Sequence, residues 1–145
     1  MKMRTLCGIL VTLAGACPHA WGAAPRAPVG ISIVDFGFPA GTNRFGCASD
    51  PAVFERALAP LGAVRRIPAE RLGETNVLSR ETTDLLVVPC GSAFPADAAP
   101  ALRAYLKAGG SLLTTGGYAF DAPLMRGADG CWQTADDVRA ALPPG

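Results

Sequence analysis

The stretch of residues 85–120 constrains the fold of this chain most strongly. It reads LLVVPCGSAFPADAAPALRAYLKAGGSLLTTGGYAF, and it joins a β-prone run (85–89), a Gly-Ser turn, a helix with start and stop signals, and a second apolar run (111–115). This order predicts one strand–helix–strand unit of a parallel sheet. An α/β fold class therefore follows from this stretch, whereas a function does not.

The composition indicates one globular domain without a strong surface charge. The 145 residues are 50% hydrophobic and 17% charged, and the formal net charge is +1. Disordered chains instead combine low hydrophobicity with high net charge. Arginines occur singly apart from Arg65-Arg66, so no basic stripe is available to neutralise phosphates, and we expect no nucleic-acid partner.

The chain begins with the three regions of a secretory signal peptide, residues 1–22. Lys2 and Arg4 form a charged start, residues 6–16 an apolar segment, and residues 20–22 a small-x-small cleavage site. The apolar segment is shorter than the roughly 20 residues that a membrane-spanning helix needs. We therefore expect a protein that is not transmembrane and that is secreted or periplasmic.

An alternative to free secretion is a lipid anchor. Residues 13–17 resemble a degenerate lipoprotein processing site, in which Cys17 would be the lipidated residue. In either case residues 23–145 are expected to form the predicted α/β domain.

Cleavage of the signal removes His19, the only histidine, and leaves three cysteines, Cys47, Cys90 and Cys131. In an oxidising compartment at most one intramolecular disulfide can form among three cysteines, most simply Cys47 with Cys131 or Cys47 with Cys90. A zinc site of three thiolates is the alternative. It lacks a histidine and a tight Cys-x-x-Cys pair, so we expect no metal.

Hydrophobic periodicity and capping signals predict the remaining elements. Asp50 and Pro51 are typical of a helix start, and Asp97 is expected to cap the later helix. Strands are expected over residues 29–34, 63–67, 85–88 and 111–115, and helices over 51–61, 97–107 and, weakly, 134–142. The charged strand 63–67 is expected at a sheet edge.

This order predicts a three-layer, flavodoxin-like parallel sheet with helices on both faces. A doubly wound domain usually has a fifth strand, and none is predicted here. The chain is therefore interpreted either as a small variant of the fold or as the front part of a longer protein.

The segments DLLVVPCGSAF and AGGSLLTTGGYAF resemble the class I glutamine amidotransferase-like superfamily. The resemblance is to the domains of that fold in large secreted glycoside-hydrolase-like proteins and near the trimerisation domain of some bacterial β-galactosidases. It covers about a third of the chain closely. It implies a flavodoxin-like fold and a link to carbohydrate metabolism, although one fold carries many functions.

The resemblance also implies that the reaction is lost. Catalysis in that family needs a cysteine on the sharp turn after the strand that here spans residues 111–115, with a histidine as base. Gly116 occupies the nucleophile position, and the mature chain has no histidine. The implied protein is a non-catalytic module without a cofactor.

Open α/β sheets bind ligands at the carboxyl ends of their strands. Polar residues that follow the predicted strands are expected to form a ligand rim there, and these are Asp35, Asn43, Arg44, Ser92, Tyr118 and Asp121. Phe36, Phe38, Phe94 and Phe120 lie beside them in the sequence. Such a rim predicts a carbohydrate or protein ligand, and the simpler interpretation is that the carboxylates cap loops and the aromatic rings fill the core.

Two catalytic alternatives remain open at the sequence level. Cys90 follows a strand and precedes Gly91-Ser92, whose N–H groups are expected to be able to hold an anion, but no base accompanies it. Asp35 and Asp121 would hydrolyse a glycoside only if held about 5 to 9.5 Å apart around a cleft. The leading hypothesis is therefore a secreted, non-catalytic accessory or interaction module. A hydrolase and a truncated fragment of a longer secreted protein are the alternatives, and the oligomeric state is left open.

Overall fold

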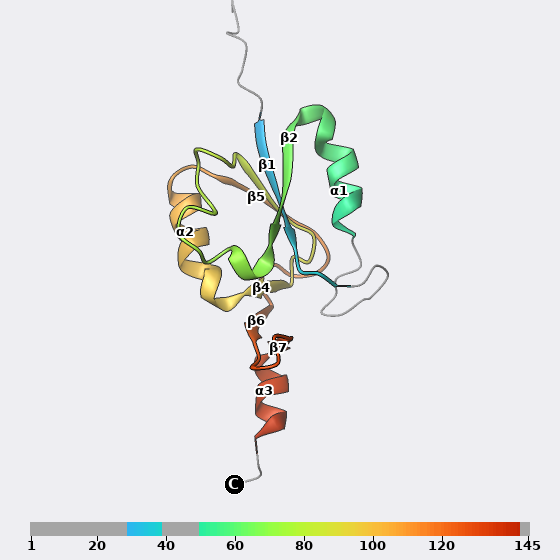
Figure 1. Ribbon diagram of the computed structural model, residues 1–145, viewed down its shortest axis with the longest axis vertical. Helices are drawn as coiled ribbons and strands as arrows, with labels where there is room; N and C mark the ends of the chain where they lie inside the picture. The colour runs from blue at the N-terminus through green and yellow to red at the C-terminus, as the bar shows by residue number, and fades with distance from the viewer. Residues whose placement is uncertain (1–28, 39–49, 143–145) are drawn as a thin grey trace, which may run out of the picture.

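A computed structural model describes residues 29–38 and 50–142 of the chain. Its centre is a four-stranded sheet in the order β2-β1-β3-β5 (Figure 1). All three neighbouring pairs are parallel. The strands are β1 (Val29–Asp35), β2 (Gly62–Pro68), β3 (Leu85–Val88) and β5 (Ser111–Thr114). The predicted α/β class and the edge position of β2 are thus confirmed.

Two helices cover opposite faces of this sheet, α1 (Pro51–Leu58) and α2 (Ala99–Lys107) (Figure 1). Alternate residues of a strand point to opposite faces. On one face Ile33 and Val87 pack in a cluster with Phe54 of α1. On the other face Leu86 packs in a larger cluster with Tyr105 of α2.

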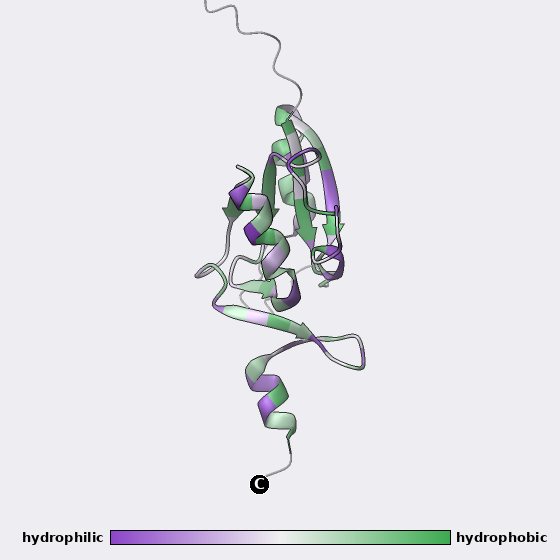
Figure 2. Cartoon of the chain, turned by 90° about the vertical axis from the view of Figure 1, so that its left-hand side faces the viewer, coloured by the Kyte–Doolittle hydropathy of each residue, from purple (hydrophilic) through white to green (hydrophobic). Residues whose placement is uncertain are grey.

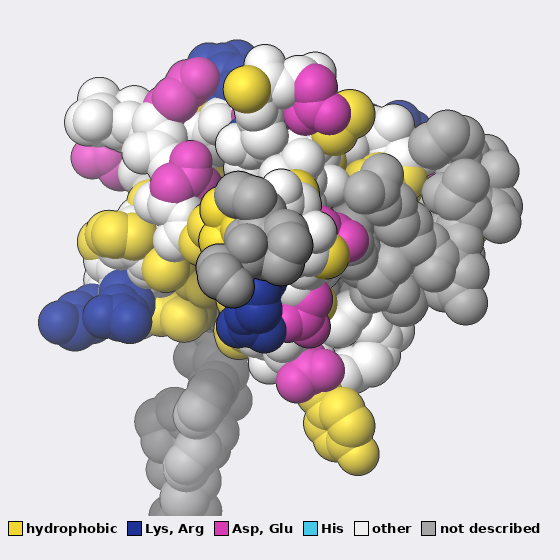
Figure 3. Space-filling view, turned by 90° about the horizontal axis from the view of Figure 1, so that it is seen from below, with side chains coloured by type: hydrophobic (Ala, Val, Ile, Leu, Met, Phe, Trp, Pro, Cys, Tyr) yellow, Lys and Arg dark blue, Asp and Glu magenta, His cyan; other side chains and the backbone are white. Residues whose placement is uncertain are grey.

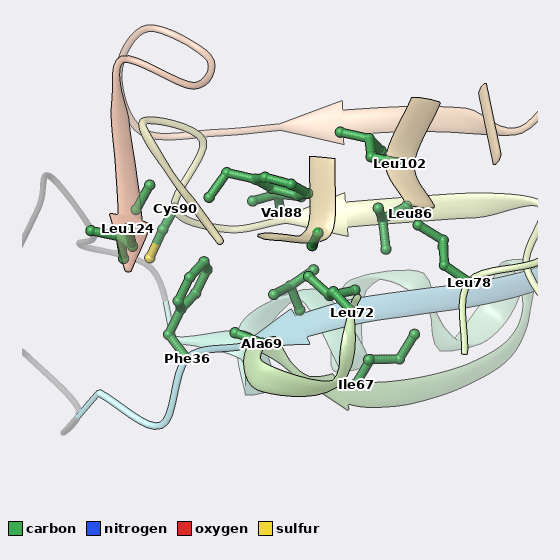
Figure 4. Close-up of a cluster of buried hydrophobic side chains, with 14 of the residues drawn as sticks. Phe36, Ile67, Ala69, Leu72, Leu78, Leu86, Val88, Cys90, Leu102 and Leu124 are labelled. Carbon is green, nitrogen blue, oxygen red and sulfur yellow. The ribbon is translucent and has the colours of Figure 1, made fainter. Parts of the chain in front are cut away.

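The larger cluster forms the main hydrophobic core (Figure 4). It extends from Leu78 and Leu86 to Cys90, Phe36 and Leu124, and all of these side chains are at least nine-tenths buried. The core therefore joins the four-stranded sheet to residues that lie beyond the carboxyl ends of β1 and β3.

A second, smaller sheet, which was not predicted from the sequence, is formed by one strand from the β3–α2 connection and two strands that follow β5. Its strands, in the order β4-β6-β7, are β4 (Ala93–Pro95), β6 (Ala122–Arg126) and β7 (Trp132–Thr134). β4 pairs with β6 in parallel, and β6 pairs with β7 in antiparallel orientation. The small sheet and the final helix α3 (Ala135–Ala141) lie at the carboxyl end of the four-stranded sheet (Figures 1 and 2).

Of the two predicted helix caps, at Asp50 and at Asp97, only the first is confirmed. Asp50 accepts the Ala52 N–H at 2.8 Å, as expected for the start of α1. At the start of α3, Thr134 and Asp137 form a capping box. The Asp97 cap is wrong, because Asp97 lies in a preceding 3₁₀ turn, Ala96–Ala98, and α2 starts after Ala98 without a side-chain cap. Two further 3₁₀ turns, Ala59–Leu61 and Ala69–Arg71, flank β2.

No helix within residues 29–38 and 50–142 is long and apolar enough to cross a membrane.

Arg65 on the edge strand β2 donates hydrogen bonds to two buried hydroxyl groups, those of Ser32 and Thr83. Its Nε atom donates to Ser32 Oγ at 2.9 Å, and Nη2 lies within 3.1 Å of Thr83 Oγ1. Ser32 and Thr83 are 0% and 1% exposed, and their hydroxyl oxygens are 2.7 Å apart. The same Nη2 atom donates to the Val77 carbonyl at 3.0 Å. Arg65 therefore holds the connection between β2 and β3 against the sheet.

Replacing Arg65 with methionine is expected to lower the free energy of unfolding by about 1–3 kcal/mol, because hydrogen bonds from a charged donor are lost and Thr83 keeps only neutral partners. Arg65→Lys should recover only part of this loss, since an ammonium group cannot reproduce the planar fork of donors. Chemical denaturation measures both effects. The exposed Arg103 on α2 supplies the control, and equal losses for Arg65→Met and Arg103→Met would contradict the assignment.

Candidate functional site

A pocket of about 580 Å³ opens at the carboxyl end of β1. Its lining comes from the ends of β1 and β2 and from the β6–β7 turn, and comprises Asp35, Phe36, Gly37, Phe38, Arg66, Pro68, Glu70, Arg126, Gly130, Cys131 and Trp132. This edge of a parallel sheet is where α/β proteins bind ligands, and the volume lies in the range of small-molecule sites. The end of the molecule that carries α3 exposes apolar and charged side chains side by side (Figure 3).

One wall of the pocket is aromatic. The rings of Phe36 and Phe38 are stacked, with centroids 5.4 Å apart and an interplanar angle of 10°. Trp132 meets Phe36 edge-on at 6.0 Å. Phe36 and Trp132 are 7% and 8% exposed, whereas Phe38 is half-buried. Phe36 and Trp132 are thus fixed by the core, and Phe38 extends the aromatic surface toward solvent.

Arg126 links the aromatic wall to the charged groups. Its guanidinium carbon lies 5.6 Å from the centre of the Trp132 ring, a cation–π distance. Its Nε atom donates to the Gly130 carbonyl at 3.0 Å, and Nη1 lies 3.9 Å from Glu70 Oε1. The ion pair is solvent-exposed and adds little stability, but it holds Arg126 across the pocket.

Arg66 organises the second charged group. It forms a bidentate pair with Glu55, with both N···O distances at 2.7 Å, and it reaches Asp35 Oδ2 at 3.4 Å. The hydrogen bonds from Arg66 lower the pKa of Glu55. Asp35 also accepts the Gly37 N–H at 2.8 Å. Each carboxylate of the pocket therefore has a basic neighbour, and Asp35, Glu70, Arg66 and Arg126 balance in charge.

The structure brings only part of the predicted rim to this pocket. Asp35 lines it, whereas Ser92, Tyr118 and Asp121 do not. Tyr118 is 85% exposed. Ser92 lies beside Gly117, and Gly117 belongs to the turn after β5. Asn43 and Arg44 fall outside the described residues, as does Cys47.

Cys90 is placed in the core rather than at a reactive surface. It is 2% exposed and disulfide-bonded, and its partner is not Cys131, which is a free, exposed thiol. The adjacent Gly91 N–H donates to the Thr115 carbonyl at 2.6 Å. The expectation that this N–H could hold an anion is therefore wrong, because it is already bound.

Gly116, which was predicted from the sequence to take the place of a nucleophile, lies just beyond β5 with a φ of 78°. Glycine adopts this left-handed conformation without a steric penalty. The turn is therefore unstrained at Gly116, and this residue presents no side chain for covalent chemistry.

Within residues 29–38 and 50–142, no three His, Cys, Asp or Glu side chains cluster as a metal ion would require.

Four residues of the pocket were not predicted from the sequence, namely Arg66, Glu70, Arg126 and Trp132. The available signal was the Asp129-Gly130 dipeptide between two β-prone segments, which is typical of a hairpin turn. Gly130 indeed has a φ of 77°, and Arg126 pairs with Trp132 across the hairpin. Recognising this turn would have placed Trp132 opposite Arg126.

Comparison of the chain with protein-family profiles, with curated proteins and with solved structures gives no match.

Proposed function

We propose that this protein is a secreted, non-catalytic binding module that holds a neutral carbohydrate in the pocket at the carboxyl end of β1. The observation that carries the proposal is the combination of an aromatic wall, Phe36, Phe38 and Trp132, with charge-balanced polar groups in the same pocket. Sugars present an apolar C–H face, which packs on aromatic rings, and a rim of hydroxyl groups, which carboxylates and guanidinium groups bind.

The charge balance favours a neutral ligand over an ionic one. Asp35 lies beside Arg66, and Glu70 lies beside Arg126. An anion or a cation would have to displace one member of a pair, whereas a hydroxyl group can donate to the carboxylate and accept from the guanidinium. Hydroxyl groups are thus the ligand atoms that suit both pairs.

Several features favour binding over catalysis. Asp35 is held by Arg66 and by the Gly37 N–H, and Asp121 does not line the pocket. Cys90 is buried and oxidised. Together with the glycine at position 116, these features support the interpretation of an amidotransferase-like accessory module in carbohydrate metabolism.

Intrinsic fluorescence provides a direct test. Trp132 is one of two tryptophans, and the other, Trp21, lies in the predicted signal peptide, so emission from the exported protein reports on the pocket. We expect saturable changes on titration with at least one of lactose, cellobiose, maltose and chitobiose, each recovered intact. No saturable change with any of these sugars would contradict the proposal, and cleavage of a sugar would favour the hydrolase.

Phe38→Ala is expected to weaken sugar binding about tenfold, because an aromatic contact contributes about 1–1.5 kcal/mol. Phe38 is suitable because it is only half-buried and Trp132 remains as the reporter. The matched control is Tyr118→Ala, which removes an aromatic ring that does not line the pocket. If both variants lose affinity equally, the ligand does not lie against Phe38.

A further inference from the structure

The two edges of the four-stranded sheet differ in chemistry. The β2 edge carries Arg65 and Arg66, and charged residues are a common protection against edge-to-edge pairing. The β5 edge, Ser111–Thr114, reads SLLT and carries neither charge nor proline. Of these two edges, only β5 lacks such protection.

The backbone of β5 also presents hydrogen-bonding groups outward. Ser111 N donates to the Asp84 carbonyl at 3.0 Å and Thr115 N to the Val88 carbonyl at 3.2 Å, so both face β3. Successive residues of a strand direct their N–H and C=O groups to alternate sides. Leu112 and Thr114 therefore direct theirs away from β3, where no described strand pairs with them.

The same strand leaves an apolar side chain exposed. Leu112 packs against the main core, but Leu113 points to the opposite face and is 39% exposed. Leu113 lies in register with Val87, which belongs to the cluster under α1. That helix packs on β1 and β2. Burying Leu113 thus requires a group outside the described part of the chain.

We propose that the β5 edge is the interface for a second copy of this chain, which pairs with it in antiparallel orientation about a two-fold axis through Leu113. A two-fold axis perpendicular to the sheet keeps each face on its own side. Leu112 then lies opposite Thr114 of the partner and exchanges both of its outward hydrogen bonds with it. The two Leu113 side chains meet as a non-hydrogen-bonded pair, with Cα atoms about 4.5 Å apart.

A second copy suits this edge because the strand is complementary to itself. Pairing of two SLLT strands opposes no charges, and it covers the exposed leucine of each copy with the other. Pairing through β2 would instead bring Arg65 and Arg66 close to the same residues of the other copy. The interface is isologous, as in most homodimers, and it closes without propagating.

Sedimentation equilibrium of the exported protein tests the proposal. The wild-type protein is expected to be a dimer, and Leu113→Lys to be a folded monomer with a dissociation constant at least 100-fold higher, because like charges then oppose each other at the axis. The matched control is Leu61→Lys, at a side chain that is 63% exposed and distant from β5 in the sheet order; it should remain dimeric. A monomeric wild-type protein, or a Leu113→Lys dimer, overturns the proposal.

A cross-linking variant tests the register independently of charge. In a Cys131→Ser background, which removes the exposed free thiol, Leu113→Cys is expected to form a disulfide-linked dimer on mild oxidation. The expected Cα separation of about 4.5 Å lies within the range for disulfides. Leu61→Cys in the same background should stay uncross-linked. Equal cross-linking of both variants, or of neither, overturns the two-fold pairing.

Discussion

Replacing Tyr105 with alanine is expected to lower the free energy of unfolding by about 3–5 kcal/mol, a large part of the stability of a domain of this size. Tyr105 is 2% exposed. Its hydroxyl oxygen lies 2.9 Å from the carbonyl oxygens of Asp84 and Ser111 and accepts the Ser111 N–H at 3.1 Å. One side chain of α2 thus fixes the starts of both β3 and β5.

The tight fit of the Tyr105 ring adds to this effect. A Cβ atom at Gly110 would lie 2.2 Å from the ring, so Gly110 leaves the space that the tyrosine fills. Burial raises the pKa of Tyr105, and the hydroxyl keeps its proton and its hydrogen bonds at neutral pH. Alanine would remove the ring, and it would also remove the hydroxyl group that hydrogen-bonds to the backbone at the starts of both β3 and β5.

Denaturant unfolding of three variants separates the contributions. Tyr105→Phe keeps the ring and should cost about 1–3 kcal/mol for the lost hydrogen bonds. Tyr105→Ala should cost more, and Tyr118→Ala, at a side chain that is 85% exposed, should leave stability unchanged within about 0.5 kcal/mol. A Tyr105→Ala variant no less stable than Tyr118→Ala would show that α2 does not anchor β3 and β5.

The elements that carry their own local signals could be predicted from the sequence. β1 and β3 are short apolar runs, as expected for strands covered on both faces. Asp50 and Pro51 mark the start of α1, and Gly109 ends α2 with a φ of 88°. The alternation of these elements predicts a parallel sheet without knowledge of any distant contact.

The small sheet and the pocket could not be predicted because they depend on contacts between distant segments. β4 and β7 have three residues each, too few for a periodic pattern, and β4 is ordered by pairing with β6. Phe36 and Trp132 meet only once the hairpin has folded over the end of β1. The prediction that Asp97 caps α2 failed for a similar reason, because no local pattern in the sequence indicates the 3₁₀ turn that precedes this helix.

The second large effect is expected from a disulfide between Cys47 and Cys90. Cys90 is disulfide-bonded and Cys131 is a free thiol, so Cys131 is not the partner of Cys90. Because Cys7 and Cys17 precede the predicted cleavage site, we expect Cys47 to be the partner of Cys90 in the mature chain. Peptide mapping without reduction is expected to recover Cys47 linked to Cys90 and Cys131 alkylated.

Loss of this bond should lower stability by about 4 kcal/mol in the chain-entropy treatment, because the bond closes a long loop that contains α1 and β2. The thermal midpoint of Cys47→Ser is expected to fall by about 10–20 °C. Cys131→Ser should leave it unchanged, and reduction of the wild-type protein should reproduce the Cys47→Ser value. Three alkylatable thiols in the native protein, or a linked peptide that contains Cys131, would contradict the pairing. Three alkylatable thiols, or a link between Cys47 and Cys131, would also leave Cys90 reduced and so reopen the hydrolase alternative.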